Sequence, residues 1–308
     1  MKRIIGLIFL ILYIFVFLVA CMTAPGDAAP NYNLQDPSNH YSPTPYGSFR
    51  FEWNEEYNGY FVYESDSNIY TSIVIPQAYQ GSLVVGIGEF AFGSYSNVQN
   101  VIIPDTVKVI ESNAFNYCDY LENIVFNGKS SLLEIKENAF FNCKTLTQIT
   151  VPASVELIGL NAFSTCPSLE RINVDVNNKN YCAVNGVLYS KDMKTLIAVP
   201  PAFPSVNFEI LNGIVNIANC AFFNSDSIAT ITIPATVKNI GDNVFGEYLK
   251  EINYEGSCSE WMNLIRDDSY NSSVPSEPGG EVAPENPDIN DENCCVVNCN
   301  DGTVKMER

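Results

Sequence analysis

Cysteine is the residue type whose spacing in this sequence suggests chemistry, and the chain contains ten of them among 308 residues. Cys118, Cys143 and Cys166 each stand four residues after an alanine, in one recurring register. If the repeats stack at strand spacing, about 4.7–4.9 Å, two of these residues come within the Cα separation of a disulfide, about 4.4–6.8 Å. Three in a row cannot all pair, and we favour small buried thiols that fill an interior.

A second group of cysteines, Cys294, Cys295 and Cys299, lies near the C-terminus. Thiolates are soft metal ligands, but a Cys₄ or Cys₂His₂ set at zinc spacing is absent from the sequence. The single histidine, His40, stands in a proline-rich segment away from them. We therefore expect no metal and no other cofactor.

Catalytic motifs are also missing from the sequence. It contains no G-x-S-x-G, H-E-x-x-H or P-loop pattern and no second histidine. Acidic pairs such as Glu55-Glu56 and Asp267-Asp268 are expected on the solvated surface of a chain with 35 Asp and Glu residues. We predict a protein that is not an enzyme, and a hydrolase with sparse carboxylate chemistry is the alternative.

The charge balance narrows the class of partner. Lys and Arg number 16 against 35 Asp and Glu, which gives a formal net charge of −19. Such an acidic surface argues against binding to nucleic acid or directly to anionic lipid. It is typical of a soluble surface protein whose copies repel one another, or of a protein that binds basic patches on a partner.

The N-terminal residues resemble an export signal. Residues 1–20 begin with Lys2-Arg3 and continue as an apolar run, which is typical of a signal peptide. The sequence Leu18-Val19-Ala20-Cys21 resembles a bacterial lipobox, which implies lipidation of Cys21 and contact with the membrane through that lipid alone. An ordinary signal peptide, giving a secreted protein, and a signal anchor are the alternatives. Residues 21–48 are rich in Pro, Asn, Ser and Gly and predict a disordered tether.

The rest of the chain is organised by an internal repeat. An Ala-Phe pair recurs, mostly at steps of 23 or 25 residues, and begins at Ala91, Ala114, Ala139, Ala162 and Ala221, with Val244-Phe245 as a variant. An isoleucine stands four residues before each pair, and another aliphatic residue stands three residues earlier still. After each pair comes L-x-x-I-x-h, where h is apolar. A fixed period in this range indicates a solenoid.

These positions together resemble the BspA-like leucine-rich repeat, over roughly residues 50 to 260. The resemblance implies a β-rich solenoid of about 23-residue repeats with short parallel strands. It also implies a surface protein, of the bacterial lipoprotein type, that adheres to other proteins. The L-x-x-I-x-h segments are expected to form the strands, and Ala-Phe a tight turn in which Phe fills the interior.

The predicted solenoid, residues 49–266, has caps and one irregularity. Alternating residues on both sides of Asn58-Gly59 predict an N-terminal capping hairpin. Residues 175–213 resemble an enlarged repeat of the family, and the resemblance places Trp261, Leu264 and Ile265 in a C-terminal cap. Residues 267–293 predict a disordered acidic spacer rich in Pro and Ser, and 294–308 a hairpin or tail. Residues 127–131 are expected to form a loop insertion.

Stacking should align the outward residues of the predicted strands into two rows. The rows continue to Glu251 and Asn253, and solenoids bind partners over such surfaces. We expect binding of a host matrix or cell-surface protein, or of a neighbouring-cell protein; an envelope-organising lipoprotein with a partner in its own cell envelope is the alternative. The residues expected to bind are Asn100, Ile102, Asn123, Val125, Gln148, Thr150, Arg171, Asn173, Thr230 and Thr232, with Ile102 and Val125 forming an exposed apolar patch.

Overall fold

The structure is a computed structural model, and it describes residues 49–64, 71–95, 97–127, 129–264 and 294–307. All of them belong to one compact unit, His40–Arg308. The expected signal peptide, Cys21, the tether and the spacer 267–293 lie outside the described residues. Within the described part, no helix is long and apolar enough to cross a membrane.

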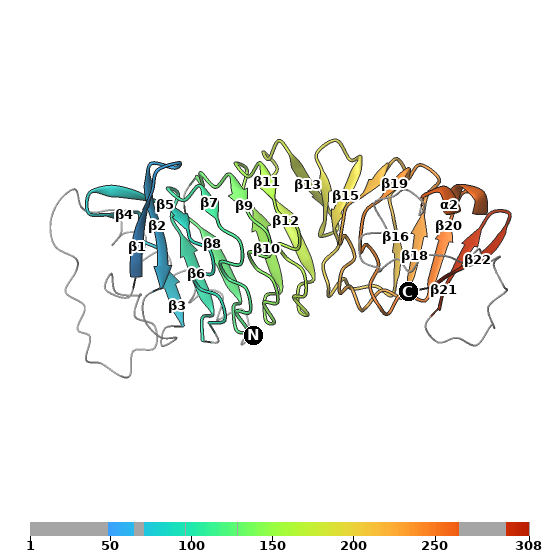
Figure 1. The fold of residues 1–308 in the computed structure, drawn as a ribbon, viewed down its shortest axis with the longest axis horizontal. Coiled ribbons are helices and arrows are strands. Elements are labelled where there is room, and N and C mark those ends of the chain that lie inside the picture. The colour runs from blue at the N-terminus through green and yellow to red at the C-terminus, as the bar shows by residue number, and fades with distance from the viewer. Residues whose placement is uncertain (1–48, 65–70, 96, 128, 265–293, 308) are drawn as a thin grey trace, which may run out of the picture. The chain divides into compact units, whose positions relative to one another are not determined.

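Each regular repeat contributes two strands to a β-solenoid (Figure 1). The predicted L-x-x-I-x-h strands are confirmed, and they pair in parallel in three pairs of successive strands. They form the first ladder, which contains β6 (Asn100–Ile103), β8 (Asn123–Phe126), β10 (Gln148–Val151), β12 (Arg171–Val174), β18 (Thr230–Ile233) and β20 (Glu251–Tyr254).

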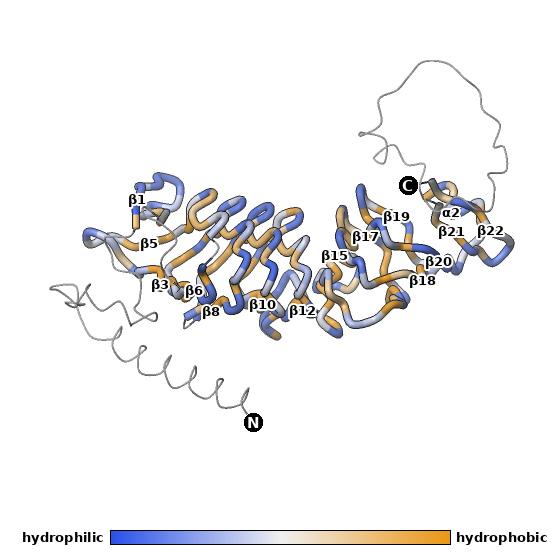
Figure 2. Tube along the Cα trace, turned by 90° about the horizontal axis from the view of Figure 1, so that it is seen from below, coloured by the Kyte–Doolittle hydropathy of each residue, from blue (hydrophilic) through white to orange (hydrophobic). Residues whose placement is uncertain are grey.

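A second ladder, which the sequence analysis did not predict, runs through the aliphatic positions that precede Ala-Phe. Its strands are too short to show a period of two residues, and their pairing in register identifies them. They are β7 (Val109–Ile110), β9 (Glu134–Ile135), β11 (Leu157–Ile158), β17 (Asn216–Ile217) and β19 (Asn239–Ile240). Figure 2 shows apolar residues concentrated along the strands and polar residues at many of the connecting turns.

The Ala-Phe turn is a tight turn, as predicted. Asn113, just before Ala114, has φ 60°, a left-handed conformation that asparagine tolerates better than most residues. The Phe115 N–H donates to the carbonyl of Ala139 in the next turn at 2.8 Å. Ala114 and Phe115 are fully buried, because the crowded backbone leaves room for a methyl group and the phenyl ring points inward.

The N-terminal cap is the predicted hairpin. Strands β1 (Phe49–Asn54) and β2 (Gly59–Glu64) pair antiparallel across Asn58-Gly59. Strand β2 then pairs in parallel with β5 (Ser82–Ile87), which begins the second ladder. Two short strands, β3 (Ser72–Val74) and β4 (Ala78–Tyr79), complete this end: β3 pairs with β6, and β4 pairs with β5.

The enlarged repeat is an antiparallel unit within the stack. Its strands are β13 (Tyr181–Val184), β14 (Val187–Ser190) and β15 (Thr195–Ala198), and β15 continues in parallel to β17. A further strand, β16 (Asn207–Glu209), pairs with β18 and resumes the first ladder. The buried core divides here, because Leu188 packs with the N-terminal repeats and Val187 with the C-terminal ones.

The C-terminal end is closed by a helix and a hairpin. Helix α2 (Cys258–Leu264) begins with a capping box, in which Ser257 Oγ accepts from the Glu260 N–H at 3.2 Å and Glu260 Oε2 accepts from the Ser257 N–H at 2.9 Å. Trp261 is fully buried. Strand β21 (Cys294–Cys299) pairs in parallel with β20 and antiparallel with β22 (Gly302–Glu307). Ile265 lies outside the described residues.

Candidate functional site

The strand face is the set of outward side chains on the first ladder. Their strand registers place Asn100 opposite Asn123 and Ile102 opposite Val125. The same register brings together Gln148 with Arg171, Thr150 with Asn173, Thr230 with Glu251, and Thr232 with Asn253. The structure therefore aligns each of these sequence-predicted residues with its neighbour across the stack.

The two rows expected from stacking are interrupted in the structure. The first ladder consists of three sheets, with orders β3-β6-β8, β10-β12 and β16-β18-β20-β21-β22. The first break follows β8, where the loop insertion at residues 127–131 adds length before the next turn. The second follows β12, where the enlarged repeat replaces a regular turn.

A correction concerns Ile102 and Val125, which were expected to form an exposed apolar patch. Both side chains are half-buried. Gln148, Thr150 and Arg171, on the middle sheet, are exposed. Neighbouring outward side chains cover part of one another along the ladder, and this shielding is not visible in the alternation of a single strand.

Amide side chains bridge neighbouring strands on this face. Asn123 Nδ2 donates to Asn100 Oδ1 at 2.9 Å, and Asn100 Nδ2 donates to Ser72 Oγ at 3.3 Å. On the C-terminal sheet, Asn298 Nδ2 donates to Asn253 Oδ1 at 3.0 Å. These bonds hold the amides in defined positions, which lowers the entropy lost when a partner contacts them.

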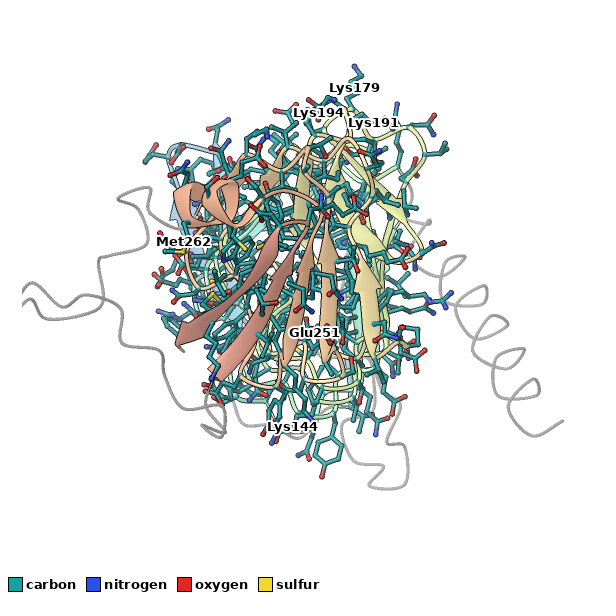
Figure 3. The ribbon with its side chains drawn as sticks, turned by 90° about the vertical axis from the view of Figure 1, so that its right-hand side faces the viewer. Lys144, Lys179, Lys191, Lys194, Glu251 and Met262 are labelled. Carbon is teal, nitrogen blue, oxygen red and sulfur yellow. The ribbon has the colours of Figure 1, made fainter. Side chains whose placement is uncertain are left out.

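The strand face is nearly neutral. Arg171 and Glu251 are the only charged residues in the two rows expected from sequence, and their charges cancel, whereas the chain carries −19. Strand β16 adds one exposed carboxylate, Glu209, in register with Thr232. Figure 3 marks Glu251 on the last sheet. The acidic excess of the chain therefore lies away from these rows.

The backbone of the enlarged repeat packs closely against the strand face. Gly186 has φ +84°, and a Cβ placed there would lie 2.7 Å from Arg171 Cβ. The Ile172 N–H donates to the carbonyl of Gly186 at 2.8 Å. The glycine of the Asn185-Gly186 turn is thus required both by its backbone conformation and by its contact with Arg171.

Three exposed lysines gather on the enlarged repeat, and the sequence analysis did not single them out. Figure 3 shows Lys179, Lys191 and Lys194 at the same edge of the molecule. Lys191 Nζ donates to the carbonyl of Val176 at 3.3 Å, and Lys194 Nζ to that of Gly213 at 3.4 Å. Hydrogen bonds from the Ser190 hydroxyl and the Lys194 N–H lower the pKa of Asp192, which lies among them. Lys179 precedes β13, whereas Lys191 and Lys194 lie between β14 and β15, so the three lysines do not form a single sequence motif.

A cavity of about 380 Å³ lies where the enlarged repeat interrupts the Ala-Phe turns. Its walls include Phe163 from the preceding turn, Leu188 and Ile197 from the enlarged repeat, and Cys220 from the following turn. Burial raises the pKa of the Cys220 thiol. The lining is mainly apolar, so the cavity can accommodate an apolar group better than a charged one.

The cysteines of the repeat register lie inside the solenoid, as favoured from sequence. The side chains of Cys118, Cys143 and Cys166 are fully buried, and none of the cysteine side chains that the structure describes forms a disulfide. Each thiol donates to a phenylalanine carbonyl of the preceding turn, namely Cys118 to Phe92 at 3.1 Å, Cys143 to Phe115 at 3.3 Å and Cys166 to Phe140 at 3.1 Å. Burial raises the pKa of the Cys143 thiol well above its ordinary value.

One other group of potential ligands was missed because its members are distant in sequence. Cys258, Cys299 and Asp301 place their sulfur and carboxylate oxygen atoms within 4.8 Å of one another. The sequence analysis grouped Cys299 with Cys294 and Cys295, but the Cys295 side chain is fully buried in the core instead. Docking of the terminal hairpin against α2 creates this cluster, and no sequence spacing encodes it.

Comparison with known proteins identifies the family to which this repeat belongs. A family model described as "BspA type Leucine rich repeat region" matches residues 61–185 and 202–270, more than half of the chain, in six copies. A comparison with curated proteins found no match. Among solved structures, the pneumococcal vaccine antigen PcpA is 23% identical with a TM-score of 0.51, and the alignment covers 60% of this chain and 51% of that one. The chain thus shares the fold of PcpA and spans about half its length.

Two further bacterial structures are similar. A leucine-rich repeat protein from Eubacterium ventriosum is 20% identical with a TM-score of 0.48, covering 70% of this chain and 75% of that chain. The T. pallidum leucine-rich repeat protein is 24% identical with a TM-score of 0.44, covering 68% of this chain and 81% of that chain.

Proposed function

Because this chain belongs to the BspA-type leucine-rich repeat family, we propose that it is a non-enzymatic adhesin that binds a protein of a host or neighbouring cell through its strand face. The family supports a protein-interaction repeat module, since solenoids bind partners over the extended surfaces that stacking creates. The description of the pneumococcal relative as a vaccine antigen supports display of this chain outside the cell.

The near neutrality of the strand face carries the proposal. The centres of protein interfaces are depleted of charged residues compared with the rest of the surface. In a chain of net charge −19, a partner that approaches the rows from Asn100 to Asn173 meets amides and hydroxyls together with Arg171. The bridged amides, such as Asn100 with Asn123, present hydrogen-bonding groups that are already positioned.

Lipid anchoring through Cys21 is part of the same proposal. A thioether-linked lipid on that residue would hold the solenoid at a membrane while residues 22–48 separate the two. Mass spectrometry of chain purified from membranes tests this part, because Cys21→Ala abolishes the lipid. Recovery of unlipidated protein from the medium would support the secreted alternative.

The test of the strand face measures binding of the full-length chain to a panel of purified host matrix proteins and to whole cells. Ile102→Lys with Val125→Lys introduces two charges at register neighbours on β6 and β8. The matched control, Leu157→Lys with Leu160→Lys, introduces the same charges at side chains that are 47% and 43% exposed, away from the rows. Circular dichroism checks that both variants fold.

We expect saturable binding that weakens about tenfold or more in the strand-face variant, a loss of roughly 1.4 kcal/mol, and stays unchanged in the control. Ile102 and Val125 are half-buried, so Gln148→Lys with Thr150→Lys supplies a second variant at exposed positions. Equal losses in face and control variants would refute the assignment of the face. Absence of binding at micromolar concentration would favour the envelope-organising role.

A further inference from the structure

Two thiols from segments far apart in the sequence meet at the C-terminal cap. Cys258 is the first residue of α2 and Cys299 is the last residue of β21. Their sulfur atoms lie within 4.8 Å of each other. Both side chains are half-buried, so a small reagent can reach them.

Hydrogen bonds independent of sulfur hold the two residues in this position. The Asn300 N–H donates to the carbonyl of Gly256 at 2.9 Å, and Asn300 Nδ2 donates to the carbonyl of Glu255 at 2.7 Å. The Cys258 N–H donates to Asp301 Oδ1 at 2.7 Å. The turn between β21 and β22 is therefore docked on the residues that lead into α2, and this docking keeps the two sulfur atoms near each other.

Gly302, the first residue of β22, also lies beside Cys258. A Cβ on Gly302 would lie 3.6 Å from Cys258 Sγ, an ordinary van der Waals distance. Burial, and then the hydrogen bond with Cys258, raises the pKa of the Cys299 thiol to about 12. In the reduced protein, Cys299 is therefore held as a neutral thiol.

We propose that Cys258 and Cys299 form a disulfide that fastens the terminal hairpin to the cap helix. Two S–H bonds break and one S–S bond forms. The two electrons and two protons pass to a small-molecule disulfide such as oxidised glutathione, which is reduced to two thiols. The bond joins the ends of a chain segment that contains residues 265–293, so the hairpin stays beside β20 even when its hydrogen bonds open.

The donor set favours a disulfide over a metal ion. Structural zinc sites take four protein ligands, whereas this cluster offers three. One carboxylate oxygen of the third member, Asp301, already accepts from the Cys258 N–H. A disulfide requires only the two sulfur atoms that face each other.

The test equilibrates the full chain with an excess of oxidised glutathione and maps its cysteines by alkylation and peptide mass spectrometry. We expect a disulfide-linked peptide pair containing Cys258 and Cys299, with the mass of two hydrogens lost. The pair is absent in Cys258→Ser and present in Cys182→Ser, whose partly buried thiol contacts the Ser190 carbonyl and Met193 Sδ instead. Hydrogen exchange of β21 and β22 is expected to slow on oxidation in the wild-type chain and in the Cys182 variant.

Three results would overturn the proposal. Both thiols could stay open to alkylation after the treatment. Either cysteine could link to another residue, such as Cys294. Zinc could bind one equivalent to the reduced chain and protect both thiols, which would assign the cluster to a metal. Each result is read on the wild-type chain, so it does not depend on whether a variant folds.

Discussion

Phe115 and Phe140 stack in the solenoid interior with their ring centroids 5.3 Å apart and their planes within 1° of parallel. Phe92 extends the stack on one side, at 5.2 Å from Phe115, and Phe163 extends it on the other, at 6.1 Å from Phe140. Phe222, in the next Ala-Phe turn of the regular register, instead contacts Phe208 edge-to-face at 5.1 Å. The enlarged repeat therefore interrupts the stack of rings as well as the strand face.

Truncation of a stacked ring should be costly. Phe115→Ala removes a fully buried ring between two others, and we expect a loss of about 3–5 kcal/mol in the free energy of unfolding. Chemical denaturation followed by circular dichroism measures it. Phe90→Ala, at a side chain 57% exposed, is the control and should cost less than about 0.5 kcal/mol. Similar losses in both variants would contradict the stacked core.

A buried asparagine joins the regular repeats to the enlarged one. Asn178 is 1% exposed, and its Nδ2 donates to the carbonyls of Pro152 and Val155 at 2.8 and 3.0 Å. Its Oδ1 accepts from the N–H groups of Asn180 and Tyr181, each at 2.8 Å. Every hydrogen-bonding group of the amide is thus used.

Asn178→Ala removes the amide partner of the buried Val155 carbonyl and of the Asn180 and Tyr181 N–H groups, while the Pro152 carbonyl still accepts from the Val155 N–H. We expect a loss of at least about 2 kcal/mol, since each unsatisfied group costs about 1–3 kcal/mol. Thermal unfolding measures the effect. Asn177→Ala, at the exposed neighbouring residue, is the control and should change the midpoint little. A loss no larger than that of the control would show that the joint does not depend on this amide.

The cysteine register accepts a hydroxyl in one native repeat. Ser225 stands four residues after Ala221, where three other repeats have Cys118, Cys143 and Cys166, and its Oγ donates to the carbonyl of Val199 at 3.5 Å. Cys143→Ser should therefore retain the hydrogen bond to Phe115. Cys143→Val loses that bond and adds volume to a packed core. We expect it to lower the free energy of unfolding by about 1–3 kcal/mol, which is a larger loss than that of Cys143→Ser. A lower denaturation midpoint for Cys143→Ser than for Cys143→Val would contradict this role of the thiol.

Tyr57 gives the N-terminal cap a pH dependence. Burial, followed by the charge of Glu134 and the hydrogen bond to it, raises the pKa of Tyr57 to about 12, and its hydroxyl donates to Glu134 Oε1 at 3.2 Å. Because the folded pKa exceeds the unfolded value of 10.0, the neutral phenol contributes stability that is complete below pH 10 and lost as pH rises toward 12.

Unfolding midpoints of the wild type and Tyr57→Phe measured between pH 8 and about 12 test this dependence. The difference between them should be constant below pH 10 and shrink above it. Tyr120→Phe, at an exposed tyrosine, corrects for general alkaline effects. A difference that stays constant over the whole range would show that Tyr57 titrates alike in the folded and unfolded chain.

The sequence by itself determined the solenoid, its repeat, its inward residues and both places where the repeat changes length. It did so because a buried aliphatic or aromatic residue must recur at the same point of every turn. The interior positions of residues such as Ala139, Phe140 and Ile149 can therefore be predicted from the local sequence. The turns at Asn58-Gly59 and Asn185-Gly186 can be predicted in the same way.

Only the tertiary structure decided how the turns meet where the repeat is irregular. Whether β8 pairs with β10, how far Ile102 is shielded, and which groups Asn178 satisfies all depend on the three-dimensional path of the chain between neighbouring turns. The approach of Cys258 to Cys299 depends on the terminal hairpin docking beside β20. Residue spacing fixes contacts between regular turns, but contacts across insertions and between distant segments are set by packing and backbone hydrogen bonds, which no local period encodes.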